Sequence, residues 1–324
     1  MGVNASVLAV DAGNSKTDVA LIGEDGTVLA SARGGGFQPP LVGVEPAVDV
    51  LAAVVGDALA LCGESAGPVE HVSACLANAD LPVEEEELAE ALRARGWGRT
   101  VEVRNDTFAI LRAGVDEPRG VAVVCGAGIN CVGMVPDGRT ARFPAIGRIS
   151  GDWGGGSGLA EEALWFAARA EDGRGEPTEL ARALPARFGL GSMYELIEAL
   201  HRGRIDARQR HALTPVLFAT SEAGDPVAAA LVDRLADEVV AMASVALGRL
   251  GLLDQEVPVV LGGSVLAARH ARLDRRITAL LSERAPGAVI RVVGQPPVLG
   301  AGLLGLDRVG AAPAAHRALR AHYA

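Results

Sequence analysis

Short apolar segments alternate with segments of helical periodicity through the first third of the chain. Each short segment ends in glycine, asparagine, aspartate or another turn former, which is the pattern of a β-strand followed by a turn. Two longer segments space their apolar residues three and four positions apart, which predicts amphipathic helices. The predicted strands are 6–10, 18–22, 27–31, 69–76 and 100–103, and the predicted helices are 46–61 and 83–95.

The same order of elements begins again near residue 120. A strand and a glycine turn are followed by two more strands, which are joined by Pro136, Asp137 and Gly138. The second set comprises strands 120–125, 130–135, 139–143, 257–261 and 289–293, and helices within 157–250, over 265–284 and through the C-terminal residues. The repetition indicates an internally duplicated α/β unit, with a cleft between the two halves.

The length and the repeat predict the division into domains. A chain of 324 residues is typical of two domains. We expect an N-terminal α/β domain over 1–116, a C-terminal α/β domain over 117–300, and terminal helices over 301–324 that pack back on the first domain. Ligands of open α/β sheets bind at the carboxyl ends of strands, so the glycine turns at those ends are the places to look for chemistry.

Composition and charge exclude several classes of protein. With 49% hydrophobic and 22% charged residues the chain can bury a large core, and its net charge of −10 argues against nucleic acid or an anionic membrane as a partner. The first apolar run ends at Asp11 without a basic segment before it, and there is no uncharged apolar run of about 18 residues. The four cysteines lack CxxC spacing. We therefore expect a cytoplasmic protein with reduced thiols.

The first glycine turn follows strand 6–10. Successive backbone amides in a tight turn form a concavity for an anion, and Lys16, the only lysine among the 30 basic residues, adds a positive charge. Asp11, at the strand end, can hold Mg²⁺ through water. The alternative is an ordinary hairpin with a buried aspartate. If the turn binds phosphate, the residues in contact with the nucleotide are Gly13, Asn14, Ser15, Lys16 and Thr17.

Two further glycine turns lie in the second half. One repeats the geometry of the first turn, and two such turns facing a duplicated cleft could clasp the β- and γ-phosphates of a nucleotide. The other ends strand 257–261 and opens a helix, where glycines without side chains could lie flat against an adenine. The alternatives are hairpin glycines with positive φ and close strand–helix packing. The nucleotide-binding residues predicted here are Gly126, Ala127, Gly128, Gly262, Gly263 and Ser264.

Asp106 lies just past strand 100–103. A carboxylate at this place can accept the proton of an attacking hydroxyl and orient it in line with a γ-phosphate. The alternative is an N-cap for the helix that begins near Thr107, since aspartate is favoured there.

A glycine-rich loop over 150–158 precedes a predicted helix. Its five glycines permit close approach of the backbone to a ligand or to the facing domain. Asp152, within it, is a candidate for binding substrate hydroxyls or metal-bound water. The alternative is a flexible hinge in which Asp152 is a turn residue.

Five segments together resemble the BadF/BadG/BcrA/BcrD ATPase family and, within it, the N-acetylglucosamine kinase-like proteins. The resemblance covers residue 7 to about residue 306, and its segments are "LAVDAGNSKTDVAL", "VRNDTFAILRAG", "GVAVVCGAGINCVGMVPDGR", "GRISGDWGGGSGLA" and "VVLGGSVL". That family belongs to the actin-like ATPase superfamily. The fold it implies is α/β, with duplicated actin-like ATPase (ribonuclease H-like) domains and a nucleotide and substrate cleft between them.

The resemblance also implies roles for the motifs. Turns 11–17 and 126–128 would be the two phosphate loops, and Gly262-Gly263 would be the adenosine motif. Asp11 would lie near Mg²⁺, and Asp106 would be the catalytic base for a sugar hydroxyl, the 6-OH of a hexosamine. Asn130 and Asp152 match positions that touch the sugar in N-acetylglucosamine kinases. The implied cofactors are ATP and Mg²⁺, the implied substrate is a small sugar, and analogy with such folds suggests a homodimer.

The sequence departs from the family pattern in the residues expected to bind the nucleotide and in those expected to bind the sugar. The second phosphate loop lacks two hydroxyl residues, which would weaken nucleotide binding roughly 10–100-fold unless backbone amides compensate. The usual sugar-loop residues are replaced by others that can still bind hydroxyls, namely Gln38, Asn78 and Asp80. A free amino group needs a carboxylate partner, so Asp80 makes glucosamine a competitor of N-acetylglucosamine.

Three functions are therefore open. The first is an ATP-dependent amino-sugar kinase. The second is a non-catalytic protein that binds a nucleotide or a sugar, which the altered second loop would suit. The third is an ATPase activator of a dehydratase or reductase, whose relatives hold an iron–sulfur cluster. Cys125 and Cys131, which flank the second loop, resemble core or loop thiols more than ligands of such a cluster.

Overall fold

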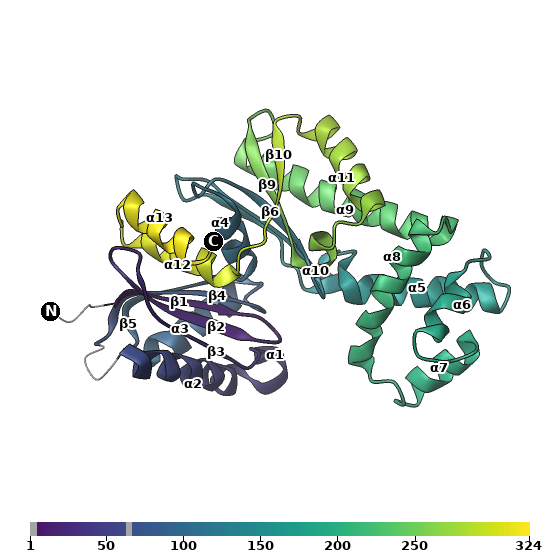
Figure 1. Cartoon of the computed structure of the whole chain (residues 1–324), viewed down its shortest axis with the longest axis horizontal. Coiled ribbons are helices and arrows are strands. Elements are labelled where there is room, and N and C mark those ends of the chain that lie inside the picture. Colours follow the sequence, from purple (N-terminus) through teal and green to yellow (C-terminus); the bar gives the residue numbers. More distant parts are fainter. Residues whose placement is uncertain (1–4, 63–66) are drawn as a thin grey trace. The chain divides into compact units, whose positions relative to one another are not determined.

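The computed structural model describes residues 5–62 and 67–324 and contains two five-stranded sheets (Figure 1). Contacts within the chain divide it into two compact units. Unit 1 comprises residues 1–122, 132–144 and 291–324, and unit 2 comprises residues 123–131 and 145–290.

The first sheet has the strand order β3-β2-β1-β4-β5. Its first three strands form an antiparallel meander, and β4 and β5 continue the sheet in parallel with β1. The strands are β1 (Ala5–Ala12), β2 (Thr17–Gly23), β3 (Val28–Gly34), β4 (Val69–Leu76) and β5 (Gly98–Asn105). The helices that follow these strands along the chain are α1 (Pro39–Val42), α2 (Val44–Cys62), α3 (Pro82–Ala94) and α4 (Thr107–Gly114).

Strand β1 is buried on both faces because helices cover both sides of the sheet. Leu8 and Val10 point into a core shared with α2 and α3, whereas Val7 and Ala9 lie against glycines of α12 (Pro297–Arg308). The alternation follows from the two-residue period of a strand. Figure 1 shows α2 and α12 on opposite faces of this sheet, and α13 (Pro313–His322) beside α12.

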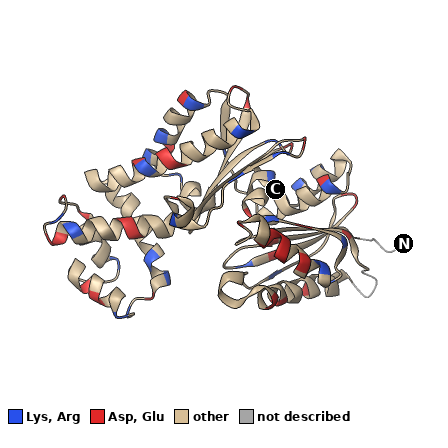
Figure 2. Ribbon diagram, turned by 180° about the vertical axis from the view of Figure 1, so that it is seen from behind, with Lys and Arg blue, Asp and Glu red and all other residues tan. Residues whose placement is uncertain are grey.

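Acidic residues gather on α3 (Figure 2). Its first turn carries Glu84, whose carboxylate accepts hydrogen bonds from the amides of Asp80 and Leu81 at 3.0 and 2.8 Å. Negative charge near a helix N-terminus is favoured by the helix dipole. The bonds fix the loop that joins β4 to α3, which is the loop with the candidate residue Asp80.

The second sheet has the strand order β10-β9-β6-β7-β8. Its strands are β6 (Gly120–Cys125), β7 (Ile129–Met134), β8 (Thr140–Arg142), β9 (Val257–Gly262) and β10 (Ala288–Val292). A helical region follows β8, with the elements η1 (Gly147–Ser150), α5 (Gly155–Glu171), α6 (Leu180–Ala186), α7 (Met193–His201), η2 (Ala207–Leu213), α8 (Thr214–Glu222) and α9 (Pro226–Leu250).

The helix predicted over 265–284 is wrong as a single element. The structure has two helices there, α10 (Gly263–Ala267) and α11 (Ala271–Arg284). The break falls at Arg269, which has a φ of +57° and so cannot continue a right-handed helix.

Among the described residues, no helix is both long and apolar enough to span a membrane. All four cysteines are free thiols, and Cys75, Cys125 and Cys131 are buried. The prediction of reduced thiols agrees with this arrangement.

The packing of α12 on α4 allows a direct test. A Cβ atom at Gly300 would lie 1.8 Å from the carbonyl oxygen of Ala109 in α4, whereas a Cβ at Gly56, on the exposed side of α2, would meet nothing within 4 Å. We expect Gly300→Ala to lower the free energy of unfolding by about 1–3 kcal/mol, because the two helices must separate.

Gly56→Ala is the matched control, and we expect it to be neutral or stabilising by up to about 1 kcal/mol, because alanine favours a helix. Urea denaturation followed by circular dichroism measures both variants. Equal stability of the two variants would contradict the described packing of α12 on α4.

Candidate functional site

The first glycine turn connects β1 to β2 and is held from both sides. The amide of Gly13 donates to the carbonyl of Lys16, and the amide of Phe37 donates to the carbonyl of Gly13, both at 2.9 Å. Asn14, Ser15 and Lys16 are exposed, so this part of the turn is accessible to a ligand. Thr17 is buried instead, and its hydroxyl has no hydrogen-bond partner among the described residues.

The predicted residues Gln38 and Asn78 contact this turn. The Gln38 amide donates to the carbonyl of Asn14 at 2.8 Å, and the Asn78 amide donates to the side-chain oxygen of Asn14 at 3.0 Å. Asn78 has a φ of +63°, a conformation that asparagine tolerates better than most residues. The structure therefore brings these two residues to the first turn, where they also support its shape.

Lys16 shares a carboxylate with a second cation. Its Nζ lies 3.0 Å from Oδ2 of Asp18, and Nε of Arg33 lies 2.5 Å from the other carboxylate oxygen. The two bonds hold the pKa of Asp18 below its ordinary value despite its partial burial. Asp18 thus fixes two positive side chains beside the turn.

Asp11 lies in β1, one residue before its end, and is buried. Burial raises the pKa of its carboxyl to about 7, and the nearby carboxylates of Asp106 and Asp18 add to the shift. A positively charged partner would therefore stabilise the ionised form of the Asp11 carboxyl. Among the described residues, no group of three or more His, Cys, Asp or Glu side chains could hold a metal ion. A cation at Asp11 would therefore take further ligands from water or from a substrate, which is common for Mg²⁺.

Asp106 follows the end of β5 and precedes α4. Its side chain forms no N-cap bond of the usual kind, but it accepts hydrogen bonds from the amide and hydroxyl of Thr107, and Oδ1 of Asn105 also accepts the amide of Thr107 at 2.9 Å. Asp106 therefore contacts the first residue of α4 without forming the usual N-cap bond. Burial of the carboxyl raises the pKa of Asp106 to about 6. A general base is most effective when its pKa lies close to the pH at which the enzyme operates.

Asp80 is engaged with its neighbours. Its Oδ1 accepts a hydrogen bond from Nδ2 of Asn105 at 2.8 Å, and its carbonyl accepts one from Arg142 at 2.9 Å. The carboxylate thus fixes the residue before Asp106. The sequence makes Asp80 a candidate partner for a free amino group on the sugar, and this bond gives it a structural role that the sequence does not reveal.

In unit 2, the second glycine turn packs against the start of α5. The amides of Gly156 and Ser157 donate to the carbonyls of Gly126 and Ala127 at 2.7 and 3.0 Å. A Cβ at Gly155, whose φ is +73°, would lie 2.6 Å from Gly128, so only glycine fits this contact. The carbonyls of the turn are thus directed at the helix.

Asp152 organises its own loop. Its Oδ2 accepts hydrogen bonds from the amide of Gly147 at 2.8 Å and from the hydroxyl of Ser150 at 2.7 Å. The residue also lines a cavity of about 230 Å³, together with Ala127 and Gly128 of the second turn. The indole N–H of Trp153, in the same lining, is buried without a partner among the described residues.

Asn130 lies in β7, and its Oδ1 accepts the amide of Cys131 at 2.7 Å. The residue is half-buried. The structure itself gives no further support to its predicted role in sugar binding, which stays a prediction.

The third glycine turn joins β9 to α10. Gly263 has a φ of +81°, and a Cβ there would lie 2.4 Å from the carbonyl oxygen of Cys125. Close packing of strand and helix therefore requires this glycine. The next residue, Ser264, lines a cavity of about 350 Å³ in unit 2 that also contains Gly126 and Ala127.

Sequence reasoning missed two aromatic side chains of this cavity. Phe218 and His270 stack with ring centroids 3.8 Å apart and an angle of 4° between the rings. Phe218 belongs to a region that the sequence showed only as helical, and His270 lies in the unforeseen break between α10 and α11. The sequence alone contains no signal that would have brought them together.

The two sheets, each with a meander and a glycine turn, define the class of protein as an α/β protein of the actin-like ATPase fold. A structure described as that of a proposed N-acetylglucosamine kinase from Chromobacterium violaceum matches with a TM-score of 0.70 at 22% identity, covering 94% of this chain and 99% of the other. A ROK family glucokinase from Streptomyces griseus, solved with glucose and AMPPNP, matches with a TM-score of 0.54 at 18% identity over 94% and 98% of the two chains.

Residues 8–305 match the BadF/BadG/BcrA/BcrD ATPase family, and the chain belongs to it. The N-acetylmuramic acid/N-acetylglucosamine kinase of Clostridium acetobutylicum is 26% identical over 260 residues, which is 80% of this chain and 85% of the relative. The fold and the family predicted from the sequence are thereby confirmed, and membership of an ATPase family implies the use of ATP.

The raised pKa of Asp11 makes a prediction about stability. Because the pKa is about 7 in the folded protein and about 3.9 in an unfolded chain, folding takes up protons between these values. The contribution of this group to the free energy of unfolding therefore falls as the pH rises from about 4 to 7. We expect Asp11→Asn to raise the free energy of unfolding at pH 8 by on the order of 3 kcal/mol, and by much less at pH 4.

Urea titrations at the two pH values measure the difference. Asp137→Asn, in an exposed hairpin turn, is the matched control, and we expect no rise in its free energy of unfolding at pH 8. A variant of Asp11 that is less stable than the wild type at pH 8 would show that the carboxylate has a structural role.

Proposed function

We propose that the protein is an ATP-dependent amino-sugar kinase that transfers the γ-phosphoryl group of ATP to the 6-OH of N-acetylglucosamine or a related hexosamine. The observation that carries the proposal is Asp106, a buried carboxyl that follows the end of a parallel strand and has a raised pKa. The names of the relatives, which are kinases of N-acetylglucosamine and N-acetylmuramic acid, support the substrate class.

Asp106 acts as the general base. Its ionised carboxylate accepts the proton of the sugar hydroxyl as that oxygen attacks the γ-phosphorus, and the bond from phosphorus to the β,γ-bridging oxygen breaks as ADP leaves. The pKa of about 6 keeps this carboxyl ionised at neutral pH while leaving it more basic than an ordinary aspartate.

Each phosphate loop offers a nucleotide either positive charge or backbone groups. Lys16, fixed by Asp18, supplies a positive charge at the first loop. The second loop offers backbone groups, since Ala127 lacks a hydroxyl. The cavity beside Ser264 is the place for the adenosine, with the stacked rings of Phe218 and His270 in its lining.

Asp11 is the residue suited to hold Mg²⁺, through water and together with the phosphates of ATP. When bound, the ion neutralises charge on the transferring phosphoryl group. The Asp11 carboxyl, whose pKa is raised by burial and further by two neighbouring carboxylates, fits this role, because a cation favours its ionised form. ATP as the donor is consistent with a cytoplasmic location.

The two alternative functions predict other properties. A non-catalytic binding protein would bind ATP without turnover, and the absence of a hydroxyl at Ala127 is the feature that favours it. An activator with an iron–sulfur cluster would need accessible thiolates. Cys125 and Cys131 are buried, and burial raises the pKa of Cys125 to about 12.

An assay of ADP release against a panel of sugars tests the proposal. The panel contains N-acetylglucosamine, N-acetylmuramic acid and glucosamine, each with Mg²⁺ and ATP. We expect at least one sugar to raise the rate above the sugar-free rate, and Asp106→Asn to lower that sugar-dependent rate by about 100-fold or more, since the variant cannot accept a proton.

Asp137→Asn, which changes an exposed aspartate, is the control and retains the wild-type rate. The kinase proposal fails if no sugar exceeds the sugar-free rate. Binding of ATP by calorimetry without turnover would then favour the non-catalytic alternative.

A further inference from the structure

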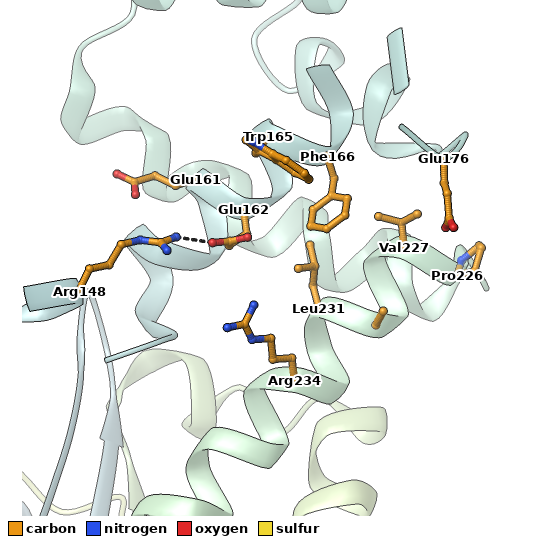
Figure 3. Close-up of a pocket in the computed structure, with 11 residues that line it drawn as sticks. Arg148, Glu161, Glu162, Trp165, Phe166, Glu176, Pro226, Val227, Leu231 and Arg234 are labelled. Atoms are coloured by element: carbon orange, nitrogen blue, oxygen red, sulfur yellow. Dashed lines mark hydrogen bonds and ion pairs between the residues drawn. The ribbon is translucent and has the colours of Figure 1, made fainter. Parts of the chain in front are cut away.

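The largest cavity described in unit 2 lies apart from the third glycine turn and its pocket. Its volume is about 760 Å³, within the usual range for ligand pockets. It opens between α5 and the N-terminal half of α9, with the segment after α5 at one end (Figure 3). Aromatic and aliphatic side chains form much of the lining, namely Trp165, Phe166, Val227 and Leu231.

Two arginines reach into this cavity. Arg148 forms an ion pair with Glu162, and Figure 3 shows both groups at the same side of the cavity as the guanidinium of Arg234. The Arg234 guanidinium lies 4.2 Å from the ring centroid of Trp153, and it forms no ion pair among the residues that the structure describes. Its hydrogen-bond donors are therefore available to a ligand.

Carboxylates line the same cavity. Glu161 and Glu176 join Glu162, so the lining contains three glutamates and two arginines. A small anion would meet the carboxylates, and a small cation would meet the arginines. A neutral polyol suits both, because each hydroxyl donates one hydrogen bond and accepts others. The mixture of charges thus favours a saccharide over an ion.

Trp165 supplies a surface for a sugar ring. Its side chain is 53% exposed although it lines the cavity, and the guanidinium of Arg169 lies over the ring, 4.6 Å from its centroid. The polarised C–H groups of a pyranose pack favourably against the negative face of an aromatic ring. A glycosyl unit can pack its C–H groups against such an exposed indole while its hydroxyls form hydrogen bonds with the neighbouring guanidinium and carboxylate groups.

The cavity is continuous in its lining with the smaller cavity at the second phosphate loop. Arg148, Glu161 and Glu162 belong to both. The smaller cavity contains Asp152, the residue predicted to touch the sugar, and the unpartnered indole N–H of Trp153. A ligand that extends from one cavity to the other would therefore be longer than a monosaccharide.

We propose that the larger cavity is a second saccharide subsite, which receives a further glycosyl unit linked to the amino sugar. Resting on the proposed function, this assignment names amino-sugar oligosaccharides as a substrate class. Arg234 and Trp165 are the residues that determine it, the first through its free donors and the second through its ring.

Calorimetric titration of the full chain with N-acetylglucosamine and with its β-1,4-linked disaccharide, N,N′-diacetylchitobiose, tests the assignment. We expect the wild type to bind the disaccharide about tenfold more tightly than the monosaccharide. Trp165→Ala and Arg234→Gln each lower the affinity for the disaccharide by about tenfold, which corresponds to about 1.4 kcal/mol, with a much smaller loss for the monosaccharide.

Matched controls come from exposed positions of unit 2 that do not line the cavity. Tyr194→Ala removes an exposed aromatic ring, and Arg275→Gln removes an exposed guanidinium. Both should bind the two sugars as the wild type does. Circular dichroism verifies that each variant is folded.

The assignment is overturned if the wild type binds both sugars equally, or if the controls lose as much affinity as the two cavity variants. ATP-dependent turnover of the same sugars separates this result from the kinase proposal. If the sugars are phosphorylated but the two cavity variants show no selective loss of disaccharide affinity, only the subsite assignment is wrong. If the two cavity variants selectively lose affinity for the disaccharide but no sugar is phosphorylated, the subsite assignment holds and the kinase proposal is wrong.

Discussion

Parallel pairing of β1, β4 and β5 is the constraint on which the candidate site in unit 1 depends. In this register Asp11 lies opposite Cys75, and Cys75 lies opposite Arg104, so the three strands end together. Asp106 follows directly after the last of them. Parallel strands need long crossover connections, which α2 and α3 supply, and these helices also cover one face of the sheet. The fold therefore brings carboxylates far apart in sequence to one edge.

That edge has an electrostatic cost. Asp11 and Asp106 both have raised pKa values because burial disfavours their ionised forms, and Asp106 further raises the pKa of Asp11. Elsewhere in the unit, buried charge is compensated, as where Arg112 lies between the carboxylate of Asp307 and the carbonyl of Val115. Buried carboxylates with raised pKa values at a strand edge are typical of a functional site, since stability alone would select against them.

The sequence predicted the duplicated α/β fold because short apolar runs, glycine turns and helical periodicity are local signals. It also placed Asp11, Asp106 and the first glycine turn at strand ends, where the structure has them. The hydrogen bonds of Asp80 and Asp152 could not be predicted, because they depend on tertiary partners or on the exact loop conformation. The stack of Phe218 on His270 and the cavity of Arg234 and Trp165 join helices distant in sequence, and periodicity does not reveal which helices meet. The predicted domain boundaries, the homodimer and the individual roles of the site residues stay predictions.

The central claim is that the ionised carboxylate of Asp106 accepts the proton of the sugar hydroxyl. The most direct measurement is the pH dependence of kcat/KM for the sugar, which reports the pKa of the essential base in the free enzyme. Because burial raises the pKa of Asp106 to about 6, the account predicts that kcat/KM falls as the pH is lowered through about 6. A value of kcat/KM that stays constant from pH 8 down to about pH 4.5, where an ordinary aspartate begins to protonate, would contradict it.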